Sequence, residues 1–317
     1  MPMSNNEAIE DYIRKHGNGC DCRLVKAEHL DELREELESR KRLGLIDETL
    51  YAAYLSSFKY RKPKCLPSSK SIVIMSVPQP SIRIGFNWRG IKHQLIVPPT
   101  YVDVFKIVKY ARSLLMESVK PAKYKFVKCF LPLKILAVRS GLAMYGRNNI
   151  TYVPKYGSYH RLVAFFTDYC CEGDNWQDAR SLPLCKTCMA CINACPTGAI
   201  KKDHFHLSAE KCITYYSELP ANENPFPEWL DYSSYGTIIG CMLCQDACPC
   251  NRNVDSWVID RCDFSQKETE YLLSGNYANP LKSSVERKLR KAGLDLSIFP
   301  RNLEAHMVRK ECNNGKS

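Results

Sequence analysis

The chain has 317 residues, with 45 lysines and arginines against 34 aspartates and glutamates, giving a formal net charge of +11. Hydrophobic residues make up 45% of it and charged residues 25%, which is the composition of a folded protein and excludes intrinsic disorder. Its length predicts about two domains. Cysteine is in excess, with 17 residues, and this excess is the first indication of metal or redox chemistry.

The N-terminal residues 1–14 contain neither the apolar segment of a secretory signal nor a twin-arginine motif. We therefore expect a cytoplasmic location and reduced thiols rather than an extracellular disulfide scaffold. The most apolar stretch, Cys129 to Tyr145, is interrupted by Lys134 and Arg139, so no membrane span is expected. The positive charge fits either a scattered basic surface or a nucleic-acid partner.

The N-terminal part predicts helices followed by a strand. Asn6 to Leu43 has helical periodicity and predicts two helices broken at Gly17-Asn18-Gly19, the second of which, Ala27 to Arg42, is rich in charge. The run Ser71 to Val77 is apolar and β-branched and is closed by Pro78, which predicts a strand.

Further helices and strands follow in the middle of the chain. Tyr101 to Ser118 has helical periodicity, and Pro132 opens a helix that runs to about Ser140 and ends at Gly141. Asn149 to Val153 and Arg161 to Phe166 predict strands on either side of a turn. Leu281 to Lys310 predicts two short basic helices split near Pro300.

These elements predict an α+β protein in several parts. We expect an N-terminal helical region (1–60), an α/β domain (61–178, with elements of 1–60), a cysteine-rich domain (179–255) and a basic helical tail (256–317).

The cysteine-rich domain contains a complete cluster-binding motif. Cys185, Cys188, Cys191 and Cys195-Pro196 have the spacing C-x2-C-x2-C-x3-C-P, in which three thiolates bind one four-iron cluster and the last ligates another. A second motif, Cys241-x2-Cys244-x3-Cys248-Pro249, lacks one cysteine of this pattern, and Cys212 stands alone between the two.

The eight cysteines supply four ligands to each of two clusters if the two motifs exchange ligands. We assign the first cysteine set (Cys185, Cys188, Cys191 and Cys248) to one 4Fe-4S cluster and the second cysteine set (Cys195, Cys212, Cys241 and Cys244) to the other. Structural zinc is the alternative for paired C-x2-C motifs, but zinc sites do not use the C-P crossover. Of the nine other cysteines, Cys170-Cys171 and Cys20-x-Cys22 are the most suggestive, and buried or incidental thiols are the simpler interpretation.

Several segments around these motifs resemble the epoxyqueuosine reductase family, which is related to the reductive dehalogenases. The segments that carry the resemblance are Leu136 to Asn148, Tyr156-Gly157-Ser158, Phe166-Thr167-Asp168, Cys185 to Ile200, Cys212 to Tyr215, and Gly240 to Pro249. The resemblance implies a bacterial-ferredoxin-like double-cluster domain that follows a nitroreductase-like domain, and two clusters that feed a cobalamin. The sequence contains no D-x-H-x-x-G segment, so a base-off corrinoid is expected.

The resemblance also suggests residues around the cofactor: Arg139, Gly141, Arg147, Asn148, Ser158, Thr214 and Tyr215. Two alternatives stay open, because the residues after Gly141 also suit a helix cap, and those after Cys212 also suit packing of a cluster against the core. Where the family has a proton-donating aspartate this chain has Val127, so Cys129 and Tyr145 become the candidate catalytic residues.

The predicted function is therefore a cobalamin-dependent iron-sulfur reductase that takes electrons from an external low-potential donor such as a ferredoxin or flavodoxin. Its substrate is a small molecule or tRNA. The alternative is a ferredoxin-like electron-transfer or activating protein without a corrinoid.

Overall fold

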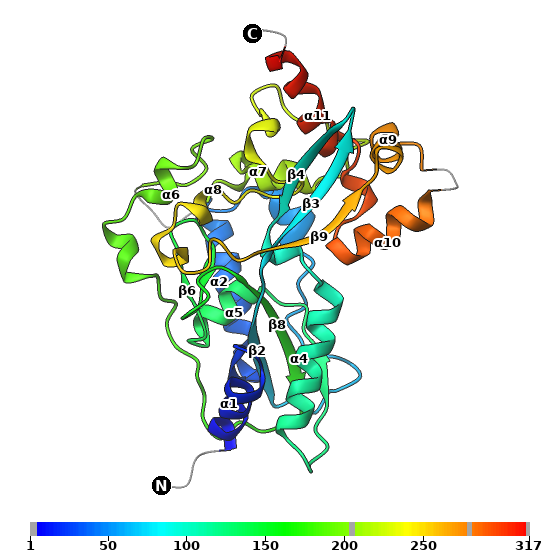
Figure 1. Cartoon of the computed structure of the whole chain (residues 1–317). Helices are drawn as coiled ribbons and strands as arrows, with labels where there is room; N and C mark the ends of the chain where they lie inside the picture. The colour runs from blue at the N-terminus through cyan, green and yellow to red at the C-terminus, as the bar shows by residue number, and fades with distance from the viewer. Residues whose placement is uncertain (1–4, 203–206, 278–280, 315–317) are drawn as a thin grey trace.

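The structure, a computed structural model, describes residues 5–202, 207–277 and 281–314 (Figure 1). The described helices are α1 Asn5–His16, α2 Leu30–Arg42, α3 Glu48–Leu50, α4 Val104–Ser118, α5 Leu133–Arg139, α6 Ala190–Asn193, α7 Ile213–Glu218, α8 Leu243–Asp246, α9 Gln266–Ser274, α10 Lys282–Ala292 and α11 Arg301–Asn314. The described strands are β1 Asp21–Lys26, β2 Ser71–Pro78, β3 Ser81–Trp88, β4 Ile91–Val97, β5 Phe126–Lys128, β6 Met144–Tyr145, β7 Thr151–Tyr152, β8 His160–Thr167 and β9 Val258–Phe264.

The first sheet is antiparallel with the order β1-β2-β8-β5, and its two central strands are buried on both faces. Ile72 and Ile74 of β2 belong to a core that also contains residues of α2 and α5, whereas Val73 and Met75 face a core formed with α1 and α4. The continuous apolar run that predicted this strand therefore reflects helices on both sides of the sheet. The mixed α+β fold that the sequence predicts is confirmed.

The second sheet differs from the sequence prediction. Strands β3 and β4 form a hairpin around Arg89 and Gly90, both with positive φ, and β9 pairs in parallel with β3. The prediction of a helical tail over 256–317 thus misses β9, whose alternating charges suit an edge strand and whose Asp260 pairs with Arg83 at 3.0 Å. Helices α9, α10 and α11 cover this sheet in a core of their own (Figure 1).

Two further predictions are corrected by the tertiary pairing. Strand β1 lies between α1 and α2, where only a helix break is predicted, because its partner β2 is about 50 residues away in the chain. Strand β7 pairs with β6 rather than with β8. The predicted helices at 132–140 and after Pro300 are confirmed as α5 and α11. Within the described residues, no helix combines the length and apolar character needed to cross a membrane.

Candidate functional site

The eight motif cysteines lie in two groups that match the two predicted cysteine sets. All four members of the first set line one void, together with Arg147, Asn148 and Tyr152. All four members of the second set line another cavity, of about 180 Å³. The short helices α6 and α8, which contain Cys191 and Cys244, contact one another. The fold therefore brings Cys248 to the first motif and Cys195 and Cys212 to the second.

Each of the two groups contains thiols whose pKa is raised. Burial, followed by the neighbouring thiols of Cys185, Cys248 and Cys188, raises the pKa of Cys191 to about 11. Burial, followed mainly by Cys212 and Cys195, raises the pKa of Cys241 to about 12. Four thiols held this close disfavour ionisation of one another, and a bound cation removes that penalty. The arrangement is that of ligands for a metal cluster.

The hairpin β6-β7 lies between the two cysteine sets, and its loop contacts both. Arg147 donates hydrogen bonds to the backbone oxygens of Cys185 at 2.6 Å and Lys202 at 2.7 Å. Asn148 lines both cluster cavities and donates to the backbone oxygen of Cys244 at 3.4 Å. The structure thus places these two residues, which the sequence analysis suggests as cofactor-binding, against the loops that carry Cys185 and Cys244.

Ser158 anchors the loop that carries Cys248. Its backbone N–H donates to Oδ1 of Asn251 at 2.9 Å, and Nδ2 of Asn251 donates to the Ser158 hydroxyl at 2.8 Å. Asn251 is completely buried. The sequence analysis does not single out Asn251, although its place three residues after Cys248, at the end of a conspicuous motif, is a usable signal.

A large cavity, of about 640 Å³, lies beside the second cysteine set. Both candidate catalytic residues, Cys129 and Tyr145, line it. Burial is the main cause that raises the pKa of each of these side chains well above its usual range. Most of the other lining side chains are apolar and come from α2, the segment 45–58, α5 and β8.

Lys134 lies at the junction between this large cavity and the second cysteine set, since it lines both cavities. Its Nζ donates to the backbone oxygen of Asn149 at 3.1 Å. Burial lowers the pKa of Lys134, while Cys212 and Glu218 oppose that shift. In the sequence, Lys134 stands out only as a charge that interrupts an apolar stretch. A lysine in such a stretch is the signal that could have identified it as a site residue.

The remaining predicted cofactor residues have different surroundings. Arg139 pairs with Glu32 at 3.3 Å and Asp178 at 3.4 Å and does not line the large cavity. Gly141 has a φ of +73°, and a Cβ there would lie 1.9 Å from Nε2 of Gln177. Gly141 follows Ser140, the C-cap of α5, and its backbone N–H donates to the Val138 oxygen at 3.0 Å, so it terminates the helix.

The side chains of the two predicted residues after Cys212 have different surroundings. Thr214 lines the cavity of the second cysteine set. The Tyr215 ring instead lies edge-on to Tyr54, at 6.4 Å between centroids. Among the other suggestive cysteines, Cys20, Cys22 and Cys171 are buried in the core and Cys170 is exposed.

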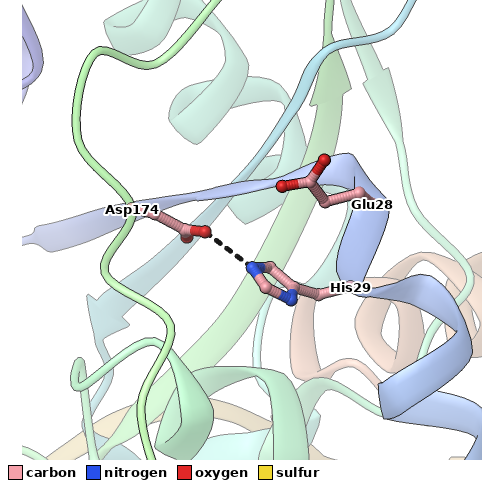
Figure 2. A group of neighbouring side chains, drawn as sticks. All are labelled: Glu28, His29 and Asp174. Carbon is pink, nitrogen blue, oxygen red and sulfur yellow. Dashed lines mark hydrogen bonds and ion pairs between the residues drawn. The ribbon is translucent and has the colours of Figure 1, made fainter.

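One group of side chains outside the cysteine motifs has the composition of a metal site. Figure 2 shows His29 pointing toward Asp174, with Glu28 nearby. However, Nε2 of His29 lies 2.6 Å from Asp174 and Nδ1 lies 2.6 Å from Glu32, so both ring nitrogens already have carboxylate partners. This group is an ion-pair cluster that fastens the segment before the cysteine-rich domain to the start of α2.

Comparison with known proteins identifies the cysteine-rich segment. Residues 184–251 match the family model described as a 4Fe-4S double cluster binding domain. The chain is 28% identical over 182 residues to an epoxyqueuosine reductase of Cyclobacterium marinum, covering 56% of this chain and 54% of that protein. The chain spans about half the length of the curated relatives that it matches first.

Two solved structures share the fold. The epoxyqueuosine reductase of Streptococcus thermophilus aligns with a TM-score of 0.65 at 20% identity, covering 97% of this chain and 82% of that one. A crystal structure of an epoxyqueuosine reductase with an epoxyqueuosine-modified tRNA-Tyr stem loop aligns with a TM-score of 0.62 at 22% identity, covering 96% of this chain and 81% of that one.

Proposed function

Since this chain is a distant homologue of the epoxyqueuosine reductases, an oxidoreductase family, we propose that it is a cobalamin-dependent iron-sulfur reductase. The observation that carries this proposal is the junction between the cavities. Lys134 and Leu207 line both the large cavity and the cavity of the second cysteine set. A ligand in the large cavity would therefore lie next to the second set, and the first set would lie on the far side of Asn148.

The residues present fit two 4Fe-4S clusters. Each cysteine set supplies four thiols around one void, and the backbone contacts of Arg147 and Asn148 hold both ligand loops. Such clusters supply one-electron transfer when bound. In this arrangement the first set would receive electrons from an external low-potential donor, such as a ferredoxin or flavodoxin. The formal charge of +11 would favour an acidic donor.

The large cavity also fits a corrinoid. Its volume of about 640 Å³ and mainly apolar lining suit a macrocycle whose tail extends toward solvent. We propose a base-off corrinoid because the sequence contains no D-x-H-x-x-G segment. When bound, such a group would supply low-valent cobalt chemistry to the substrate, and the lining residues would exclude water and orient the ligand.

The lining is basic, which bears on the substrate. Arg40, Lys128, Lys134 and Arg161 line the cavity, and Asp47 is the single carboxylate among the described lining residues. This excess of positive charge favours a ligand that carries a negative group. We propose an anionic small molecule in preference to epoxyqueuosine in tRNA, because Val127 stands where the family resemblance implies the proton-donating aspartate.

We propose that the proton donor is one of the residues that line the large cavity. Tyr145 and Cys129 both face the cavity, and the Cζ of Arg40 lies 5.7 Å from the centre of the Tyr145 ring. A nearby guanidinium stabilises a phenolate, so Tyr145 is the better placed of the two to release a proton. Burial is the main cause that raises the pKa of Cys129.

Anaerobic cofactor analysis tests the proposal. The full chain is reconstituted with iron, sulfide and cobalamin, and iron, cobalt and the corrinoid absorption bands are measured. We expect about one cobalt per eight irons and a base-off spectrum. Full iron content without cobalt uptake would support the alternative, a ferredoxin-like electron-transfer or activating protein without a corrinoid.

A cavity-filling variant locates the corrinoid. Leu133 lines the large cavity and is half-buried, so Leu133→Trp should lower cobalt uptake at least tenfold while iron content stays unchanged. The matched control is Leu114→Trp, which changes a half-buried residue in the core on the opposite face of the first sheet. Equal cobalt uptake by the two variants would contradict the placement.

A further inference from the structure

We propose that the surface over the first cysteine set is the docking surface for the electron donor, and that this donor is an acidic one-electron carrier protein. The docking surface consists of one exposed apolar residue, Leu184, and three exposed basic residues, Arg180, Lys186 and Lys202. The inference rests on the proposed function, because it requires that the first set holds a 4Fe-4S cluster. It goes further by naming the surface that the donor contacts.

Leu184 lies between the first cysteine set and solvent. It directly precedes Cys185 and lines the void of the set together with Cys185 and Cys188. The residue is nevertheless 45% exposed, so a single side chain extends from the void to the protein surface. Electron transfer weakens with distance, and a donor placed on Leu184 would be separated from the cluster by little more than that side chain.

The three basic residues are brought to this surface because the β6-β7 hairpin fastens their segment at several points. The backbone N–H of Tyr145 donates to the Arg180 oxygen at 2.9 Å. The Arg147 side chain donates to the backbone oxygen of Lys202 at 2.7 Å and to that of the residue before Lys186 at 2.6 Å. All three basic residues are exposed, so positive charge borders the apolar centre of the docking surface.

This positive charge is confined to one part of the cysteine-rich domain. Residues 179–202, which carry the first motif, contain four basic residues and no acidic one. Residues 207–255, which carry Cys212 and the second motif, contain seven acidic residues and two basic ones. An acidic partner is attracted by the first range and repelled by the second. The contrast therefore directs such a partner to the docking surface.

The form of the surface also suits a transient partner. An apolar centre with a polar rim is the usual anatomy of a protein–protein interface. Electron-transfer encounters bury less than about 1,200 Å² in total, so a few exposed side chains are sufficient. The loops around α6, which carry the first motif, lie at the periphery of the molecule (Figure 1). The donor and the ligand of the large cavity would then bind at different sites, because that cavity adjoins the second set.

The test is the rate at which reduced flavodoxin, an acidic carrier, reduces the anaerobically reconstituted full chain, followed by stopped-flow absorbance of the clusters. The variant carries Arg180→Glu and Lys186→Glu. At low ionic strength its second-order rate constant should be about tenfold below that of wild type, because the steering charge is reversed. At about 1 M salt, where the Debye length is about 3 Å, the two rate constants should agree within about twofold.

The matched control carries Lys109→Glu and Arg112→Glu, which reverse one exposed lysine and one exposed arginine on α4. Both double variants change the net charge equally, so a difference between them reports where the charge lies. Iron content, and reduction by dithionite, a small reductant that needs no docking surface, should be the same in all three proteins. A lowered cluster potential would slow reduction at every salt concentration, whereas lost steering is abolished by salt.

A second pair of variants tests the apolar centre. Leu184→Ala should raise the flavodoxin concentration that gives the half-maximal rate about fivefold. Its control is Ile259→Ala on β9, where the residue is also 45% exposed and the concentration should not change. Equal rate constants for the two double variants at low salt, a deficit that persists at high salt, or equal concentrations for this second pair would overturn the inference. A wild-type chain that binds no iron, or that dithionite does not reduce, would instead refute the proposed function.

Discussion

Gly157→Ala tests whether the turn at 156–158 holds the loop that carries Cys248. Gly157 has a φ of +53°, and a Cβ there would lie 2.1 Å from Oδ1 of Asn251 and 2.7 Å from the backbone oxygen of Cys250. The second of these neighbours is backbone and cannot rotate away. The substitution should therefore push the loop off the turn and disturb the first cysteine set while leaving the second in place.

The size of the effect follows from these contacts. An L-residue in the left-handed region costs about 1–2 kcal/mol. Displacement of Asn251 also breaks its two hydrogen bonds with Ser158, at 2.9 and 2.8 Å, and each contributes about 1 kcal/mol. We expect the free energy of unfolding to fall by about 3–4 kcal/mol.

The control is Gly90→Ala. Gly90 also has a positive φ, +77°, but a Cβ there meets nothing within 4 Å. It should therefore lose only the backbone contribution of about 1–2 kcal/mol. Urea unfolding gives the stabilities, and iron analysis after anaerobic reconstitution should show about half the wild-type iron in Gly157→Ala alone. Equal iron content and equal urea midpoints in the two variants would refute the docking role of the turn.

Two further predictions concern pH and cluster loading. Burial opposes protonation of His29, but the carboxylates of Asp174 and Glu32 outweigh burial and raise the pKa of His29. The stability that protonated His29 adds is therefore present below about pH 6.5 and is lost as the pH rises through the raised pKa. Relative to His29→Gln, the urea midpoint of wild type should thus decline between about pH 6 and 9, and a constant difference would contradict this. Cys195→Ala should halve the bound iron, whereas Cys262→Ala, in β9 and outside both motifs, should keep all of it, and equal losses would show the ligand assignment to be wrong.

Much of the chemistry could be predicted from the sequence, because cluster ligation depends on local spacing. The C-x2-C-x2-C-x3-C-P motif and the incomplete second motif led to two sets of four thiols, and the fold groups the same eight residues. The helix opened by Pro132 and ended by Gly141 was equally predictable, since proline and glycine restrict or relax the backbone where they stand.

Other features depended on partners distant in the chain. Strand β9 forms because β3 offers it an edge more than 170 residues earlier, and its own charged sequence gives little sign of a strand. Arg139 resembles a cofactor ligand in the sequence, but the fold pairs it with Glu32 and Asp178.

The sequence by itself determined the kind of chemistry this protein can hold, because thiols, their spacing and the crossover are encoded within short segments. Only the tertiary structure decided how the two cysteine sets and the large cavity lie relative to one another. Asn148 lies between the two cysteine sets, and Lys134 lies between the second set and the large cavity. That order depends on how a hairpin, a helix and two cysteine loops pack together, and such packing is determined by contacts between residues far apart in the chain.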